Sequence, residues 1–473
     1  MNGCETNTAT EILHCGGCAR ACTPRANSTA TCEMGTCRYT CQAGFGDCDG
    51  ISANGCEADL SMSTANCSAC GNACRVACVS GTCVTKWLGV GGQHTCAAGA
   101  EAVQCWGAND YGQLGDGTTT DRSTPARVRD GTGFFTRLVG VTDIAAGGSH
   151  TCVRLSFGSV RCWGANGSGQ LGDGSMTAAS TPIAVRELDG AIALAAGTSH
   201  TCARLMDGTV RCWGNNRLGQ LGDGTTTNRT TPVAVVGLRG VTDLDAGAGF
   251  TCARLSDGTA RCWGYNGNNE LGNSGSSLVE TTPVAVRGLS GVTNLSAGFN
   301  HACARLSDAT VRCWGYNFFG ELGDGTTMNR TSPPVPVASL TGVADLTAGG
   351  STTSSFSPTG YTCARLSDGT VRCWGHGDYG QLGDGMTLDR LAPVPVTGLS
   401  GVTEISAGES HTCVRLGDYS IRCWGLNFHG QLGDGTTTDR ARPTPIFTAM
   451  SSLDAGVPSD ASSPTDASSP LDR

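Results

Sequence analysis

Histidine, cysteine, aspartate and arginine recur together in one phrase, which is complete at residues 200–226 as HTCARLMDGTVRCWGNNRLGQLGDGTT. Near copies of this phrase begin at six further positions, namely His94, His150, Phe250, His301, Tyr361 and His411. Side chains of these types can bind metals, carry redox chemistry or transfer protons. Whether they do so here depends on the elements that hold them.

The two cysteines of the phrase are expected to face each other across a β-hairpin. Cys202 and Cys212 flank Met206-Asp207-Gly208, and Asp-Gly is a strong hairpin signal because Gly adopts the left-handed conformation without a steric clash. A three-residue loop there places Arg204 opposite Val210 and Cys202 opposite Cys212. Opposed Cα atoms lie about 4.5 to 5.5 Å apart, which suits a disulfide.

The other six copies predict the same bridge, although the first has a loop one residue shorter, at Ala100-Glu101. A metal site would need about four ligands, whereas each hairpin offers two, so a disulfide rung is the better interpretation. The expected pairs are Cys96 with Cys105, Cys152 with Cys162, Cys202 with Cys212, Cys252 with Cys262, Cys303 with Cys313, Cys363 with Cys373, and Cys413 with Cys423.

The remaining polar residues of the phrase also favour structural roles. The His is replaced by Phe250 and Tyr361 in two copies, which indicates packing or hydrogen bonding rather than catalysis. Arg204 and Arg211 should project from opposite faces of the hairpin and brace neighbouring units. No catalytic, cofactor-binding or metal-binding residue is therefore assigned, and the chain is predicted not to be an enzyme. The Asp of Leu-Gly-Asp-Gly is predicted to be a turn residue rather than a cation ligand, and occurs as Asp116, Asp173, Asp223, Asp324, Asp384 and Asp434, with Asn273 in the fourth copy.

Composition narrows the class of protein. The chain has 473 residues, 71 Gly, 28 Cys and a formal net charge of −9. No run of Lys or Arg suggests nucleic-acid binding, and no apolar stretch is long enough to span a membrane. So many cysteines are typical of an oxidising compartment, so we expect an extracellular or cell-surface location.

The phrase is part of a repeat that fills residues 84–448. Each unit of about 50 to 60 residues reads as four short strands, such as Val241–Leu244 for the first and Thr231–Val235 for the fourth, where Pro232 is expected to open the strand. Four antiparallel strands per unit indicate a propeller blade. The predicted fold is all-β, a seven-bladed β-propeller with a small disulfide-rich N-terminal region and a disordered C-terminal tail.

Residues 1–83 form a duplicated Cys-rich module in which Asn2–Glu5 recurs at Asn54–Glu57. Its 14 cysteines should supply the stability that its few apolar residues cannot, and their pairing is open. Zinc is an alternative at the two Cys-x-x-Cys motifs, Cys15 with Cys18 and Cys67 with Cys70. The module is similar to Cys-rich NGCE modules of bacterial surface proteins.

Three further signals come from the Cys-rich module, the C-terminal segment and the start of the chain. Calcium is a weaker alternative at the oxygen ligands Asp47, Asp49, Asn54 and Glu57, although the spacing fits no complete calcium loop. Residues 449–473 read as a disordered, acidic Ser/Asp/Pro-rich tail. No export signal follows Met1, and the abrupt start of the first module suggests that the natural start lies upstream.

The repeat resembles that of the regulator of chromosome condensation family, on the motifs at Ala196–Ala203, Asp207–Val210 and Trp213–Gly222. The resemblance implies a seven-bladed propeller. It also implies, as an alternative function, guanine-nucleotide exchange on a small GTPase, but the basic arm of the founding member is absent. The clustered Trp of the plant ultraviolet receptors is absent too. Cysteine on both hairpin strands departs from the nuclear members and points to an exported branch.

The function expected from these features is that of a secreted or cell-surface, non-catalytic scaffold that binds a protein partner. Inhibition of an extracellular enzyme is one version of this function. A monomeric propeller is expected, with no nucleic-acid partner. The insertions that interrupt the repeat are the predicted contact sites, with Phe134 and Phe135 in one and Phe356 and Tyr361 in the other.

Overall fold

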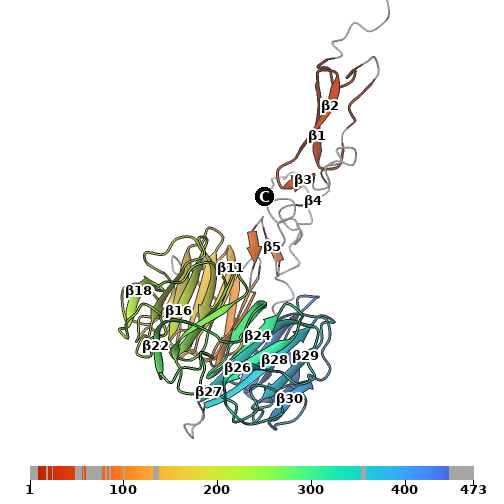
Figure 1. The fold of residues 1–473 in the computed structure, drawn as a ribbon. Helices are drawn as coiled ribbons and strands as arrows, with labels where there is room; N and C mark the ends of the chain where they lie inside the picture. The colour runs from red at the N-terminus through yellow and green to blue at the C-terminus, as the bar shows by residue number, and fades with distance from the viewer. Residues whose placement is uncertain are drawn as a thin grey trace, which may run out of the picture.

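A computed structural model shows the propeller and part of the Cys-rich module (Figure 1). The described residues are 9–16, 20–23, 25–47, 56, 58–59, 77–79, 82–84, 87–99, 102–130, 138–352 and 358–446. Within them, no helix is long and apolar enough to cross a membrane. The predicted tail and the insertion residues Phe134, Phe135 and Phe356 lie outside the described residues.

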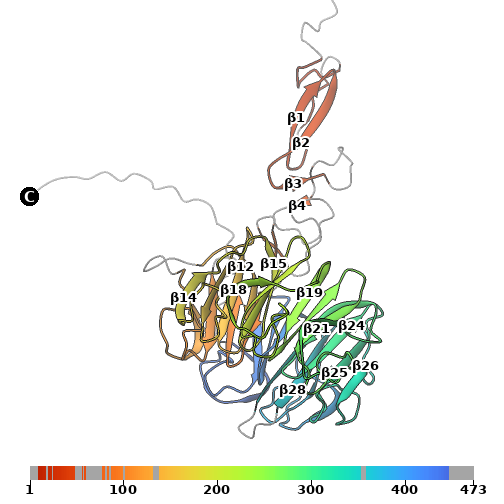
Figure 2. The same ribbon diagram turned by 60° about the vertical axis from the view of Figure 1, so that its left-hand side comes forward.

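Seven four-stranded antiparallel sheets form the ring, and each is built from consecutive strands, so the predicted seven-bladed propeller is confirmed. The four strands of a blade run in sequence order from the central channel to the rim (Figures 1 and 2). Blades 1 to 3 consist of β7 (Leu88–Val90), β8 (His94–Ala98), β9 (Val103–Gly107) and β10 (Arg122–Arg127); β11 (Val141–Ala146), β12 (His150–Leu155), β13 (Val160–Gly164) and β14 (Ala179–Ala184); and β15 (Ala191–Ala196), β16 (His200–Leu205), β17 (Val210–Gly214) and β18 (Arg229–Ala234).

The other four blades have the same order of strands. Blades 4 to 7 consist of β19 (Val241–Ala246), β20 (Phe250–Leu255), β21 (Ala260–Tyr265) and β22 (Val279–Ala285); β23 (Val292–Ala297), β24 (His301–Leu306), β25 (Val311–Gly315) and β26 (Arg330–Pro336); β27 (Val343–Thr352), β28 (Pro358–Leu366), β29 (Val371–Gly375) and β30 (Arg390–Pro395); and β31 (Val402–Ala407), β32 (His411–Leu416), β33 (Ile421–Gly425) and β34 (Arg440–Pro445).

The antiparallel order gives the ring two different faces. The first (inner) strand and the third strand of every blade end at the same face of the ring, which we call the channel-mouth face. The Asp-Gly hairpin tips and the links from one blade to the next lie at the other, which we call the hairpin-tip face. The chain enters the ring before β7 and leaves it after β34, and both points lie at the hairpin-tip face. Neither end of the ring segment therefore emerges at the channel mouth.

The predicted hairpin register is confirmed in blade 3. Arg204 pairs with Val210, and Cys202 pairs with Cys212. Gly208 in the loop has a φ of 74°, which is the left-handed conformation that the Asp-Gly signal predicted. The loop length alone therefore determined which residues of the two strands face each other.

All seven disulfides predicted across the hairpins form. Their Cα atoms lie 4.0 to 4.1 Å apart, which is closer than the predicted range. The Leu205 amide donates to the Thr209 carbonyl, so counting along the hairpin places the cysteines at a non-hydrogen-bonded pair, where antiparallel strands approach most closely. The bridges join Cys96 to Cys105, Cys152 to Cys162, Cys202 to Cys212, Cys252 to Cys262, Cys303 to Cys313, Cys363 to Cys373, and Cys413 to Cys423.

The prediction that Pro opens the fourth strand is wrong. In blade 3 this strand, β18, begins at Arg229, three residues before Pro232. Pro232 lies where the register shifts, because Cys212 pairs with Val233 but Gly214 pairs with Arg229. A proline is tolerated at an irregularity on an edge strand because no ladder hydrogen bond is lost there.

The hydrophobic cores lie between blades rather than within them. One cluster joins Val103 and Leu114 of blade 1 to Ile144 and Trp163 of blade 2, and all four side chains are fully buried. Equivalent clusters fill the other six seams. A single blade could not bury these faces, so the blades are stable only when neighbours cover them.

Side-chain hydrogen bonds join every blade to the next at the same place. The indole of Trp213 in blade 3 donates to the carbonyl of Gln170 in blade 2 at 2.9 Å. The same bond forms at all seven seams, from Trp106, Trp163, Trp213, Trp263, Trp314, Trp374 and Trp424.

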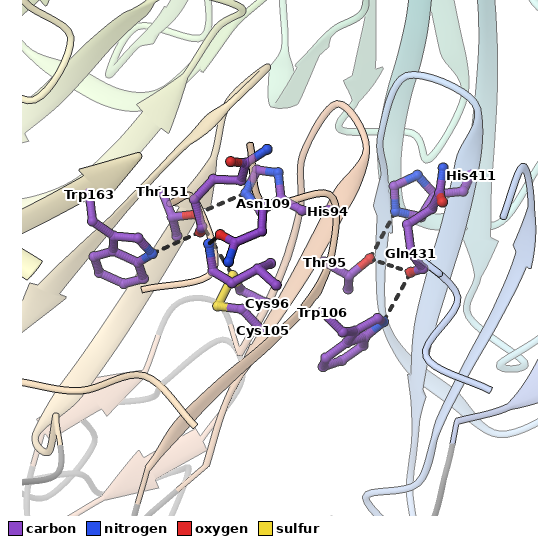
Figure 3. Close-up of a disulfide and its surroundings, with 12 residues drawn as sticks. His94, Thr95, Cys96, Cys105, Trp106, Asn109, Thr151, Trp163, His411 and Gln431 are labelled. Atoms are coloured by element: carbon purple, nitrogen blue, oxygen red, sulfur yellow. Dashed lines mark hydrogen bonds between the residues drawn. A yellow bond between two sulfur atoms is a disulfide. The ribbon is translucent and has the colours of Figure 1, made fainter. Parts of the chain in front are cut away.

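The ring closes by this same contact and not by strand exchange. No described blade combines strands from the two ends of the chain. Trp106 Nε1 and Thr95 Oγ1 of blade 1 both donate to the Gln431 carbonyl of blade 7 at 2.9 Å (Figure 3). Glu404 strengthens this seam, because its Oε1 accepts the amides of Trp87 and Leu88. Asp143 and Asp243 accept the equivalent amide of the next blade at two other seams.

The Cys-rich module has its own disulfide framework, which the sequence left open. Strands β1 (Ser28–Glu33) and β2 (Thr36–Cys41) form a hairpin, and shorter pairs join β3 (Phe45–Gly46) to β4 (Ala58–Asp59) and β5 (Ala77–Val79) to β6 (Thr82–Val84). Cys15 forms a disulfide with Cys32, so it is not available as a thiolate ligand for zinc. The bridges join Cys15 to Cys32, Cys22 to Cys37 and Cys41 to Cys56.

Candidate functional site

The channel-mouth face is positioned by the repeated segment Ala-Gly-x-x-His, in which each inner strand ends and the second strand begins. A Cβ on Gly147 would collide with the Gly197 carbonyl oxygen and with the ring of His150. The same close approach recurs around the channel, so glycine is required for the blades to meet there. These glycines are Gly91, Gly147, Gly197, Gly247, Gly298, Gly349 and Gly408.

A cavity of about 70 Å³ opens inside this ring of glycines and is lined by residues of all seven blades. Most of the lining is Gly, Ala, Val and Thr, and only Phe299 and Glu409 bring large side chains. Glu409 Oε2 accepts a hydrogen bond from Ser351 Oγ at 3.2 Å. Burial raises the pKa of Glu409 to about 7, although the Ser351 hydrogen bond opposes the shift.

Chemistry at the mouth is better suited to binding than to catalysis. A carboxylate is too weak a base to ionise the Ser351 hydroxyl, which in hydrolases requires a positioned histidine. The nearest histidines, His94 and His411, lie under the glycine ring and are fully buried. The carboxylate of Glu409 instead offers a negative charge at the entrance of the channel.

The loops after the third strands form the outer part of the same face, and a buried asparagine holds six of the seven in shape, whereas blade 6 has Gly377 at this position. In blade 3, Asn216 Nδ2 donates to Asp223 and to the Thr225 carbonyl, while Asn216 Oδ1 accepts the Leu221 amide. Asp223 also forms an ion pair with Arg229 at 2.7 Å. Burial alone would raise the pKa of Asp223, but these hydrogen bonds outweigh it and the net shift is downward. The repeated Asp is thus a turn residue, as predicted.

Aromatic side chains gather on one side of this face. They occupy the fourth and fifth positions after the repeated Trp in blades 5, 6, 7 and 1, where blades 2 to 4 carry Gly167-Ser168, Arg217-Leu218 and Gly267-Asn268. Phe318, Phe428 and Tyr111 are 62%, 73% and 54% exposed. We call this set the aromatic arc, which comprises Phe318, Phe319, Tyr379, Phe428 and Tyr111.

Contacts between rings connect the aromatic arc from blade to blade. Phe318 packs edge-on to Phe319 of the same loop, with ring centroids 5.1 Å apart. Phe319 reaches His376 of blade 6 at 4.8 Å, and His376 reaches Tyr379 at 6.3 Å. Edge-to-face geometry of this kind is favourable for aromatic pairs. Ring contacts therefore run without a break across the seam between blades 5 and 6, through the buried imidazole of His376.

Three groups near the arc could suggest a metal site, but their hydrogen bonds argue against it. Ligand atoms of His376, Asp378 and Asp389 lie within 4.8 Å of one another. Gln381 Oε1 accepts the Tyr379 amide, which fixes its amide group so that Nε2 donates to His376 Nδ1 at 2.9 Å. His376 therefore carries its proton on Nε2, toward Asp378, and has no lone pair left for a metal.

The repeated His forms a clasp between blades, which supports the structural role predicted for it. His94 Nε2 lies 2.8 Å from Thr151 Oγ1 of blade 2. The Thr151 hydroxyl donates to the Gln113 carbonyl, so His94 must be the donor to Thr151 and its Nδ1 is unprotonated. Burial lowers the pKa of His94 to about 3, with smaller contributions from the nearby His150 and His411.

The seam between blades 4 and 5 lacks both partners of this hydrogen bond. Blade 4 has Phe250 in place of the His, and blade 5 has Ala302 in place of the Thr that would accept its hydrogen bond. Phe250 is fully buried and has no side-chain polar group that would need a partner at this seam. Donor and acceptor are thus lost together, which the sequence shows only once the inter-blade pairing is known.

The structure corrects the prediction for Tyr361. Its side chain is fully buried, and its hydroxyl donates to the His411 carbonyl at 2.6 Å, so it cannot contact a partner at the surface. Tyr361 takes the position of the repeated His and joins blade 6 to blade 7, because Thr412 Oγ1 lies 3.1 Å from its hydroxyl.

The two insertions leave the ring at opposite faces. The insertion after Asp130 links a fourth strand to an inner strand and belongs to the hairpin-tip face, whereas the insertion between Thr352 and Pro358 joins β27 to β28 at the channel mouth. Residues 349–352 and 358–361 extend this hairpin beyond its length in the other blades. The described ends of the two predicted contact sites therefore lie on opposite faces of the ring.

Two buried carboxyl groups were missed by sequence reasoning. Glu270 and Glu321 stand where the other five blades have Gln, and each accepts the amide of the residue two positions earlier. Burial raises the pKa of Glu270 to about 7 and that of Glu321 to about 8. Glu321 Oε1 is buried without a hydrogen-bond partner. The signal was visible as a change from Gln-Leu-Gly to Glu-Leu-Gly in blades 4 and 5.

The fold and the repeated clasps define a class of protein, and comparison with known proteins names it. Residues 134–460 match the RCC1-like domain, and residues 102–154 match the regulator of chromosome condensation (RCC1) repeat. The chain belongs to the RCC1-like family of seven-bladed propellers, as the repeat motifs had predicted.

Among curated relatives, the Arabidopsis thaliana ultraviolet-B receptor UVR8 is 30% identical over 319 residues, covering 66% of this chain and 69% of the receptor. The human probable E3 ubiquitin-protein ligase HERC3 is 37% identical over 105 residues, which is 22% of this chain and 10% of the ligase. The second match is thus limited to a small part of a much longer protein.

Solved structures share the fold. Yeast RCC1 (Prp20), solved bound to Kap60, superposes with a TM-score of 0.64 at 20% identity, covering 75% of this chain and 85% of that one. Human WBSCR16 superposes with a TM-score of 0.63 at 20% identity, covering 74% of this chain and 94% of that one. At this level of identity the likeness concerns the fold alone.

Proposed function

We propose that this chain is an exported, non-catalytic scaffold that binds a protein partner through its channel-mouth face. The observation that carries this proposal is the uneven distribution of aromatic residues on that face. The interior contacts recur from blade to blade, yet exposed rings gather in blades 5, 6, 7 and 1. Exposed aromatic side chains are typical of the central residues of protein interfaces.

Three further features support the proposal. The ring segment begins and ends at the hairpin-tip face, so its own ends do not emerge over the arc. The related yeast RCC1 (Prp20) was solved bound to Kap60, and Prp20p binds Gsp1p and histones. The disulfide in every blade suits a protein that works in an oxidising environment, where bridges persist.

Alanine variants of the two faces provide the test. Phe318→Ala with Phe428→Ala should abolish capture of the partner from the extracellular fraction of the source cells. Phe157→Ala is the matched control, because Phe157 is 97% exposed at a hairpin tip on the opposite face. Loss of capture in the control alone would place the interface at the hairpin-tip face and refute the proposal. An inhibitor would in addition reduce the activity of a captured enzyme.

A further inference from the structure

The channel mouth contains an arrangement that the protein-binding proposal does not explain. Glu409 is the sole charged side chain in the lining of the cavity, and no cationic side chain pairs with it among the described residues. The residue equivalent to Glu409 is a glycine in both neighbouring blades, namely Gly350 in blade 6 and Gly92 in blade 1. A Cβ on Gly92 would lie 2.8 Å from Glu409 Oε1, so this oxygen sits over a bare backbone.

Phe299 of blade 5 also lines the cavity, two blades away from Glu409 of blade 7. The equivalent position in the other blades is Gly, Ala or Thr, apart from Glu409 itself. A carboxylate and an aromatic ring together bind organic cations, because one supplies charge and the other a negative π-face. Ser351 donates to Oε2 of Glu409, and Oε1 lies next to Gly92.

We propose that the channel mouth binds the guanidinium or ammonium group of an arginine or lysine side chain that a protein partner inserts at the centre of the face. This inference rests on the proposed function and specifies the chemistry of the partner. A cavity of about 70 Å³ accommodates the head group of a side chain but not a folded element. The chain's own tail is acidic overall, since residues 454, 460, 466 and 472 are Asp and Arg473 is its one cationic residue.

The test uses acetyl-Gly-Gly-Arg-Gly-Gly-amide as a probe and follows its line broadening by NMR as the full chain is added. Citrulline in place of arginine is the matched neutral control. We expect the arginine peptide to bind at least fivefold more tightly than the citrulline peptide, and Glu409→Gln to remove that difference. Equal binding of the two peptides, binding unaffected by Glu409→Gln, or no binding at millimolar peptide would overturn the inference.

A pH series separates Glu409 from its neighbours. Binding should strengthen several-fold from pH 6 to pH 8 as the carboxyl ionises. The histidines under the mouth, His94 and His411, stay neutral over this range because burial lowers the pKa of each to about 3. Glu404 on β31 faces Arg415. Glu321 lies behind Gly360 and also titrates here, so Glu321→Gln should keep the pH dependence that Glu409→Gln abolishes.

Two outcomes distinguish the inference from the proposed function. If Phe318→Ala with Phe428→Ala abolishes partner capture but Glu409→Gln leaves it unchanged, the cation site is refuted and the binding face stands. Calcium is tested in the same series as a rival cation. Glu409-dependent binding of calcium without binding of the arginine peptide would also refute the inference. Unfolding of Glu409→Gln, measured by circular dichroism near pH 4 where the original carboxyl is protonated in both the folded and the unfolded chain, should match that of the original chain, so that each loss reflects the site.

Discussion

The interior of the ring and its channel-mouth face derive from the same seven repeats, but they differ in how much the repeats vary. Inside, seven Trp indoles donate to seven equivalent carbonyls, and seven disulfides bridge the hairpins. On the face, equivalent positions carry Phe318 in blade 5 and Gly167 in blade 2. The interior is constrained by contacts that every blade must make, whereas the face is free to specialise.

The largest expected difference between the two regions concerns an aromatic side chain in each. Trp213→Ala removes a fully buried ring and its hydrogen bond to Gln170, and should cost about 3–5 kcal/mol of the free energy of unfolding. Phe318→Ala, on an exposed ring, should change stability by less than about 0.5 kcal/mol. Denaturant unfolding measures both. Equal losses would show that the arc belongs to the core.

A second expected effect tests the two carboxyl groups that break the interior pattern. The pKa of Glu321 is about 8 in the folded chain, above its ordinary value of 4.5, so its contribution to stability is lost as pH rises from 4.5 through 8. Glu321→Gln restores the residue of the other blades and should raise the free energy of unfolding by about 2–4 kcal/mol at pH 8.

The gain from Glu321→Gln should disappear near pH 4, where the carboxyl is protonated in both states. Gln170→Glu in blade 2 is the reverse change and should destabilise at pH 8 by a similar amount. If neither variant shifts stability between pH 4 and pH 8, Glu321 is not held protonated in the fold.

A third and smaller effect concerns the His clasps. The pKa of His150 is about 4 when folded and 6.5 otherwise, so its contribution is complete above pH 6.5 and is lost as pH falls toward 4. At pH 5 the loss of unfolding free energy from His150 amounts to about 2 kcal/mol. Replacing His150 by Phe and Thr201 by Ala copies the seam of Phe250 and Ala302, and should reduce the acid sensitivity by that amount.

The single variant Thr201→Ala is the control for this exchange. It leaves a buried His N–H without an acceptor, which should cost about 1–3 kcal/mol at pH 7. A double variant no more acid-resistant than the original chain would show that the His clasps do not titrate on unfolding. Unfolding midpoints from pH 4 to pH 8 give both comparisons.

Sequence reasoning was most successful where a residue's role is local to its own hairpin. The pairing of Cys202 with Cys212 followed from the loop length and the Asp-Gly signal, and so did the left-handed Gly208. It was less successful where the partner lies in another blade. The buried hydroxyl of Tyr361 was mistaken for a surface group, because its acceptor at His411 is 50 residues away.

The binding face was the least predictable part of the molecule. Interruptions of the repeat drew attention to Phe134 and Phe135, but chain direction determines which face an insertion joins, and this needed the strand order. The aromatic arc consists of single substitutions within an intact repeat. Only the alignment of all seven loops on one face makes Phe318, Phe428 and Tyr111 neighbours in a common surface.

The most direct test of the account is photo-crosslinking from the two faces. p-Benzoylphenylalanine replaces Phe318 on the channel-mouth face or Phe157 on the hairpin-tip face, and the substituted chain is irradiated in the presence of the extracellular fraction of the source cells. We predict one discrete protein adduct from position 318 and none from position 157. An adduct from position 157 alone would contradict the assignment of the channel-mouth face as the binding surface.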